Sequence, residues 1–102
     1  MMITTLSLGK FEELYACIDI GEGNDLSFKF WFNNSDQDAG LTVNCSWEKR
    51  RESLVKFLQM VDHLKPFFPE VDFDHYFVFD YDIILSKLFD RKEEIERNYF
   101  NR

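Results

Sequence analysis

Residues 26–32 read Leu-Ser-Phe-Lys-Phe-Trp-Phe, and this stretch decides the fold class. Leu26 and three phenylalanines occupy every second position, while Ser, Lys and Trp31 stand between them. Successive side chains of a β-strand point to opposite faces of the sheet, so a period of two is typical of a strand with one buried face. The stretch therefore predicts a strand whose phenylalanine side faces the core.

A second strand is predicted on the C-terminal side of this one. Apolar residues alternate with Thr, Asn and Ser at Leu41, Val43, Cys45 and Trp47. The intervening sequence SDQDAG supplies the polar turn residues that a hairpin needs. We therefore expect the two strands to pair antiparallel.

The segment 11–20 on the N-terminal side is ambiguous. Its apolar residues alternate with other residues from Leu14 to Ile20, as in a strand, but several of them also fit the spacing of a helix. We favour a strand, closed by the turn sequence GEGND. A two-residue turn at Gly9 and Lys10 would then join it to a short strand over residues 3–8.

After these strands the apolar period lengthens to that of a helix. One helix is predicted from Glu48 to Lys65, with Ser46 as its candidate N-cap and Pro66 ending it. Its apolar stripe consists of Leu54, Phe57, Leu58, Val61 and Leu64. A second helix is predicted from Asp82 to about Tyr99, with Asp82 as a possible cap and a break near Asp90. Its apolar residues are Ile84, Leu85, Leu88, Ile95 and Tyr99.

Strands that precede helices indicate an α+β fold. We predict an antiparallel β-meander of three to four strands, followed by two amphipathic helices packed on the sheet. The 102 residues are 45% hydrophobic and contain neither an internal repeat nor a linker. A chain of this length is typical of one domain, so a single domain is expected over residues 1–102.

The charge of the chain points to the chemistry of its partner. Nineteen acidic and 12 basic residues give a net charge of −7. Nucleic-acid binding depends on Lys and Arg, so a basic protein partner suits this chain better than a phosphate backbone. The start of the chain lacks the features of a signal peptide, and no apolar run is long enough to cross a bilayer. We expect a cytoplasmic monomer that binds neither membrane nor nucleic acid.

Catalytic motifs are missing from the sequence. It contains no GxSxG, no HExxH, no phosphate-binding glycine loop and no dinucleotide fingerprint. His63 and His75 lack a visible orienting partner, and Cys17 and Cys45 are expected to be free thiols outside any metal or redox motif. We therefore expect a protein that is not an enzyme and that needs neither a cofactor nor a metal ion.

The segment from Glu70 to Asp82, EVDFDHYFVFDYD, is the most unusual part of the chain. Read as an extended segment, it gathers carboxylates and a tyrosine on one side: Asp72, Asp74, Tyr76, Asp80 and Asp82. The other side is mostly aromatic, with Phe73, His75, Phe77, Phe79 and Tyr81. One interpretation is a solvated edge whose aromatics complete the core. Another is a recognition surface for Arg and Lys, to which Glu70 also belongs. A divalent metal site on the same carboxylates is a third.

Trp31 lies on the strand face opposite the phenylalanines. If helices cover both faces of the sheet, it is a core residue, and this is the position we favour. If they cover only the phenylalanine side, Trp31 is exposed and becomes an anchor for a partner.

In size, acidity, aromatic content and the acidic stretch from Asp72 to Asp82, the chain resembles the small immunity proteins of bacterial contact-dependent growth inhibition. The resemblance implies a protein that binds and inhibits a cognate basic toxin in a 1:1 complex. The toxin is expected to be a nuclease, with a ribonuclease favoured. An inhibitor of a host nucleic-acid enzyme encoded by a phage, such as an anti-CRISPR protein or DNA mimic, is the alternative within the same class. A small metal-dependent enzyme using the Asp72 to Asp82 carboxylates is the alternative from another class.

Overall fold

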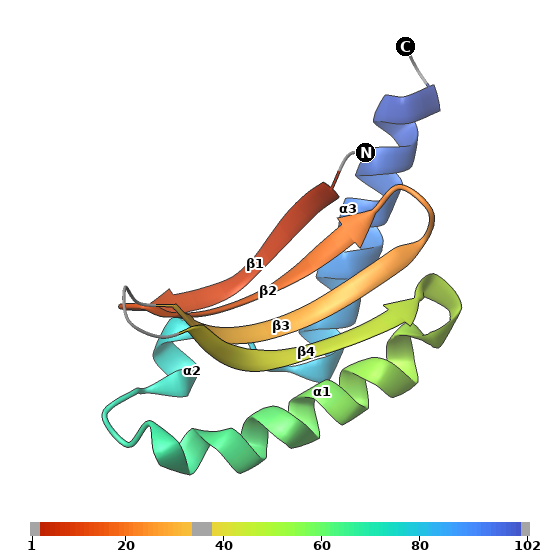
Figure 1. The fold of residues 1–102 in the computed structure, drawn as a ribbon. Helices are drawn as coiled ribbons and strands as arrows, with labels where there is room; N and C mark the ends of the chain where they lie inside the picture. Colours follow the sequence, from red (N-terminus) through yellow and green to blue (C-terminus); the bar gives the residue numbers. More distant parts are fainter. Residues whose placement is uncertain (1–2, 34–37, 101–102) are drawn as a thin grey trace.

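Four strands and three α-helices make up the chain in a computed structural model that describes residues 3–33 and 38–100 (Figure 1). The strands are β1 (Ile3–Phe11), β2 (Leu14–Gly21), β3 (Asp25–Asn33) and β4 (Asp38–Ser46). They form one antiparallel sheet in the order β1-β2-β3-β4. The loop between β3 and β4, part of the predicted hairpin turn, lies outside the described residues.

The helical part follows the sheet in the sequence. A 3₁₀ turn, η1 (Trp47–Lys49), leads into α1 (Arg50–Leu64), and a second turn, η2 (Lys65–Phe67), follows it. A short helix α2 (Phe73–Tyr76) precedes the long helix α3 (Tyr81–Phe100). The predicted α+β meander with two amphipathic helices is confirmed, and α2 is an addition to it.

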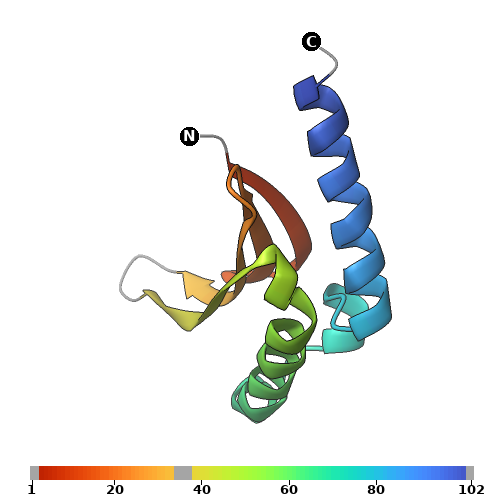
Figure 2. The same cartoon turned by 90° about the vertical axis from the view of Figure 1, so that its right-hand side faces the viewer.

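All helices lie on one face of the sheet (Figure 2). The alternation of β3 explains this arrangement, because Leu26, Phe28 and Phe30 are almost fully buried on that face. The helices contribute further residues to the same core: Leu54, Phe57, Val61, Ile84 and Leu88. The stripe predicted for α1 is confirmed at its three fully buried positions. The sheet is thus covered on one side only.

The segment 11–20 is mostly strand, as favoured, but the predicted turn at Gly9 and Lys10 is wrong. Strand β1 continues to Phe11, and the turn falls at Glu12 and Glu13, where Glu12 has a φ of 54°. Gly9 belongs to a β-bulge and has a φ of 132°. A Cβ atom there would lie 2.7 Å from the Cα atom of Phe77. Glycine is needed here because the chain around Phe77 packs directly against β1.

Three predicted details of the helices are wrong. Ser46 precedes η1 without a side-chain cap bond, and α1 begins only at Arg50. Helix α3 runs without a break past Asp90, and its C-terminal part projects beyond the sheet (Figure 1). The residue that caps α3 is Asp80 and not Asp82. Its Oδ1 atom accepts a hydrogen bond of 2.9 Å from the N–H of Ile83.

We expect Asp80→Ala to lower the free energy of unfolding by about 1 kcal/mol, the usual contribution of an N-cap carboxylate. Asp82→Ala is the matched control, because Asp82 is an exposed residue in the first turn of the same helix. It should lose only the weaker interaction with the helix dipole, about 0.3 kcal/mol for an exposed side chain. Urea denaturation of both variants provides the measurement. Equal losses would contradict the assignment of the cap.

Candidate partner-binding surface

The sheet face opposite the helices, here called the open face, carries the polar side of the strand alternation. Cross-strand register arranges its residues in three rows. The first row is Thr5, Asp19, Ser27 and Asn44, the second is Ser7, Cys17, Lys29 and Thr42, and the third is Lys10, Tyr15, Trp31 and Gly40. Within the described residues no helix covers this face (Figures 1 and 2).

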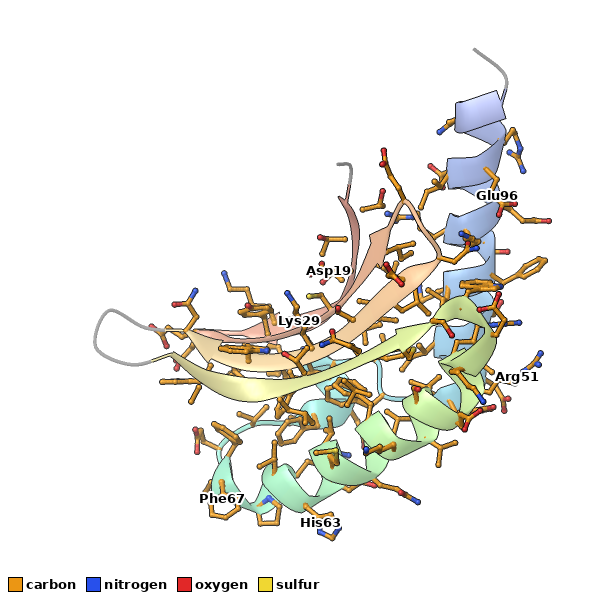
Figure 3. All side chains as sticks on the ribbon, turned by 45° about the vertical axis from the view of Figure 1, so that its right-hand side comes forward. Asp19, Lys29, Arg51, His63, Phe67 and Glu96 are labelled. Carbon is orange, nitrogen blue, oxygen red and sulfur yellow. The ribbon has the colours of Figure 1, made fainter. Side chains whose placement is uncertain are left out.

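Polar side chains on the open face are held by cross-strand bonds. Asp19 accepts a hydrogen bond of 2.8 Å from the Thr5 hydroxyl and pairs with Lys29 Nζ, also at 2.8 Å (Figure 3). The hydrogen bond with Asp19 is the main reason that the pKa of Lys29 is raised above its ordinary value. The Ser27 hydroxyl donates to Asn44 Oδ1 at 2.6 Å. These bonds fix the side-chain conformations of the first two rows before any partner arrives.

Trp31 lies in the third row, and its predicted core position is wrong. It is half-buried on the open face, and its indole N–H donates to Thr42 Oγ1 at 2.8 Å. Gly40 stands opposite it in β4, and a Cβ atom on Gly40 would come within 2.5 Å of the indole ring. The ring therefore lies against the glycine backbone in a fixed orientation. Of the two positions considered for Trp31, the structure has the one that leaves it accessible to a partner.

A polar hollow extends the open face toward the β1–β2 turn. It has a volume of about 590 Å³ and is lined by Lys10, Glu12, Glu13, Tyr15 and Asn33. The turn is tied to the end of β3 by a 2.9 Å hydrogen bond from the Asn33 N–H to the Glu13 carbonyl oxygen. These glutamates are not among the predicted binding residues, because the turn was expected at Gly9 and Lys10. The sequence signal that could have identified this turn is the polar pair Glu12 and Glu13, which separates two segments of alternating apolar residues.

The acidic segment 70–82 is not extended, so the predicted alternation of its backbone is wrong. Asp72 caps α2, accepting a hydrogen bond of 3.3 Å from the His75 N–H. Phe77 then forms an isolated bridge with Gly9, and the Val78 N–H donates to the Leu8 carbonyl oxygen at 2.7 Å. Two of the predicted binding carboxylates, Asp72 and Asp80, are thus also helix caps.

The predicted separation of acidic and aromatic side chains is nevertheless present. Glu70, Asp72, Asp74, Asp80 and Asp82 are all exposed. Three phenylalanine rings of the segment pack against Phe30, with centroid distances of 6.2 Å for Phe73, 6.0 Å for Phe77 and 5.7 Å for Phe79. His75, expected on the aromatic side, is exposed instead. Two helix caps and the short helix α2 thus produce the separation of acidic and aromatic side chains that a strand was expected to produce.

Tyr76 joins α2 to the β1–β2 turn. It is 41% exposed, and its ring lies 4.7 Å from that of Phe11, the last residue of β1. The carboxylates of α2 therefore lie at the same end of the molecule as Glu12 and Glu13. Trp31 is on the opposite face of the sheet from α2. A partner could therefore contact both Trp31 and the segment 70–82 only by reaching around this end of the sheet.

Asp80 and Asp74 occupy a different setting from Asp72. Both line a hollow of about 350 Å³ that also contains Lys65. The Lys65 ammonium lies 5.6 Å from the Phe73 ring and 5.9 Å from the Phe79 ring. This cation lowers the negative potential around the two carboxylates. Lys10 has the same effect on Glu12 and Glu13 at the β1–β2 turn, so the strongest acidic character is expected at Asp72.

The residue types that most often bind metal ions or react as nucleophiles are spread over the described part of the chain. Nowhere among residues 3–33 and 38–100 do three or more His, Cys, Asp or Glu side chains gather in a way that could hold a metal ion. Cys17 and Cys45 are free thiols on opposite faces of the sheet, and burial is the main cause of the raised pKa of each. His63 is exposed on α1 (Figure 3). No helix in the described ranges is long and apolar enough to cross a membrane.

Comparison of the chain with protein-family models, with curated proteins and with solved structures gives no match.

Proposed function

We propose that this protein is a toxin-neutralising immunity protein that binds a basic toxin domain, a nuclease with a ribonuclease favoured. The observation that carries the proposal is the fixed, half-buried Trp31 on an open sheet face that leads to Tyr15 and the glutamates of the β1–β2 turn. Aromatic residues held in place at low entropic cost are enriched among the residues that dominate binding energy. The surface therefore combines an aromatic anchor with carboxylates suited to Arg and Lys.

Charge supports the choice of a basic partner. The segment 70–82 contains five acidic residues and neither Lys nor Arg, and the net charge of the chain is −7. An acidic inhibitor is drawn to a basic toxin by long-range attraction, which raises association rates. A toxin that acts on RNA meets its inhibitor in the cytoplasm, and a 1:1 complex of monomers suffices for inhibition. No catalytic residue is required for this role.

We expect Trp31→Ala to weaken binding of the cognate toxin by about 2 kcal/mol or more, close to 30-fold in Kd. An immunity gene is expected to follow its toxin gene, so the product of the preceding gene is the binding partner to test, and titration calorimetry gives the Kd. Val55→Ala is the control, because Val55 is an exposed apolar residue on α1, away from the open face. If both variants bind as the parent does, the open face is not the anchor.

Asp72 is expected to affect the rate at which the same complex forms. Asp72→Asn should slow association at low salt and reduce the dependence of the association rate on salt. The Asn side-chain oxygen can still accept the bond from the His75 N–H, so the α2 cap is retained, and circular dichroism checks that the variant is folded. Inhibition of a host nucleic-acid enzyme in place of a neighbouring toxin would favour the phage-inhibitor alternative. A single specific site for Mg²⁺ or Mn²⁺ in calorimetry would favour the metal-enzyme alternative.

A further inference from the structure

The two edges of the sheet differ in how they are protected. The outer edge of β1 is partly covered by the chain around Phe77. The Leu8 carbonyl oxygen accepts a hydrogen bond from the Val78 N–H, and Gly9 forms a β-bridge with Phe77. Among residues 3–33 and 38–100, strand β4 pairs only with β3. In Figure 2, α1 lies beneath β4, and no drawn helix or strand runs along its outer edge. The β4 edge is therefore open to another strand.

The backbone groups available at this edge follow from the hydrogen-bond pattern. The Trp47 N–H donates to the Asn24 carbonyl oxygen at 2.7 Å, one pair beyond Asp25 and Ser46. Bonded and non-bonded pairs alternate along an antiparallel ladder. The N–H and C=O groups that point away from β3 thus include those of Gly40, Thr42 and Asn44. Together they offer donors and acceptors for the main chain of an added strand.

From Ala39 onward, the residue types of this edge do not discourage pairing. Exposed edges are usually blunted by charges, prolines or bulges. Between Ala39 and Ser46 there is no charged residue and no proline, and the register with β3 is unbroken. An unprotected edge of this length either aggregates or has a partner.

An apolar groove lies under the start of the same strand. It has a volume of about 300 Å³ and lies between the sheet and the C-terminal end of α1, lined by Leu14, Phe30, Phe32, Ala39, Leu64 and Phe68. Ala39 is exposed and small, which leaves the groove unfilled from the β4 side. Peptides that add a strand to a sheet gain affinity from main-chain bonds and specificity from pockets for alternate side chains.

We infer that the β4 edge binds an extended strand of the basic partner protein, and that one apolar side chain of this strand enters the groove beside Ala39. The inference rests on the proposed function for the identity of the partner. Charge selects this occupant, because two copies of a chain with a net charge of −7 repel each other and a basic strand is attracted. The added strand would extend the open face beyond Thr42, which holds the Trp31 indole.

The test uses an eight-residue peptide that alternates valine and threonine, with one central phenylalanine and a lysine at each end. We expect the peptide to bind the ¹⁵N-labelled protein with a Kd on the order of 1 mM or lower. The N–H signals of Gly40, Thr42 and Asn44 should shift and their exchange with solvent should slow. Thr42→Pro removes one outward N–H and should weaken binding about tenfold or more. Thr42→Ala loses the same bond to Trp31 but keeps the N–H, so the difference in Kd between the two variants measures the backbone donor alone.

A second variant tests the groove. It introduces no proline, so the inference stays testable even if Thr42→Pro fails to fold. Ala39→Leu should fill the groove and remove the preference for the phenylalanine peptide over the same peptide with alanine in its place. Equal binding by Thr42→Pro and Thr42→Ala, or peptide shifts confined to Tyr15 and Trp31, would overturn the inference. Concentration-dependent shifts of the β4 amides without peptide would also overturn it, in favour of a second copy. If the toxin binds while the peptide fails, the proposed function stands and only the β4 edge is excluded.

Discussion

Gly9→Ala is expected to lower the free energy of unfolding by about 3 kcal/mol, the upper range for a single strained position. Two effects combine at this site. The φ of 132° is unfavourable for any residue with a Cβ atom. The new methyl group would also clash with the Tyr76 carbonyl oxygen and the Phe77 backbone, which pack against the bulge. To remove this clash, the segment 76–78 would have to move away from β1. The hydrogen bond from the Val78 N–H to the Leu8 carbonyl oxygen would then be lost.

Gly23→Ala provides the matched control for this substitution. A Cβ atom at Gly23 would meet no atom closer than Asp25 Oδ2 at 3.9 Å. The control should therefore change stability by less than about 0.5 kcal/mol. Urea denaturation followed by circular dichroism measures both variants. A Gly9 variant as stable as the control would show that the bulge tolerates a side chain and that α2 is loosely held.

Phe30→Ala is expected to cost about 3 to 5 kcal/mol, as for other large aromatic side chains removed from a core. Phe30 is 2% exposed, and its ring lies within about 6 Å of four others. The four rings belong to Phe68, Phe73, Phe77 and Phe79, all in the chain between α1 and α3. Loss of the Phe30 ring would leave a cavity and remove the surface on which the whole segment 68–79 packs. The wall of the apolar groove would be lost with it.

Phe67→Ala separates this effect from the loss of any phenylalanine. Phe67 is 75% exposed and points away from the core at the end of η2 (Figure 3). Its removal should change stability by less than about 0.5 kcal/mol. Thermal and urea denaturation of the two variants give the comparison. Similar losses at Phe30 and Phe67 would contradict the described packing.

Periodicity was sufficient to predict the elements that bury one face. The strand around Phe28 and the stripe of α1 follow from periods of two and 3.6 residues, because each buries a single side against the same core. The segment 70–82 was misread because its period of two arises from other causes. Its carboxylates at positions 72 and 80 cap helices, and its phenylalanines reach the core from a helical turn and a loop. Local alternation cannot distinguish these arrangements from a strand.

The candidate binding surface was only partly predictable for a related reason. Trp31 and its position on the face opposite the phenylalanines were evident from the alternation of β3. Whether that face is covered depends on where the helices pack, which is a property of the tertiary structure. The proximity of Tyr76 to the β1–β2 turn depends on the contact between Gly9 and Phe77, residues 68 positions apart in the chain. The Gly9 bulge that permits this contact resembled an ordinary turn in the sequence.

The one-sided covering of the sheet has a consequence for synthesis of the protein. All four strands precede every helix, so the ribosome releases the complete meander before residues 54–88 can cover it. During that interval the apolar side of the meander, rich in phenylalanine, is exposed to water and to other nascent chains. The neutral β4 edge is exposed at the same time, and unpaired edges of this kind promote aggregation of partly folded chains. Fast translation of the helical half would shorten this interval, and we therefore expect slow translation of residues 50–100 to increase aggregation of the newly made protein.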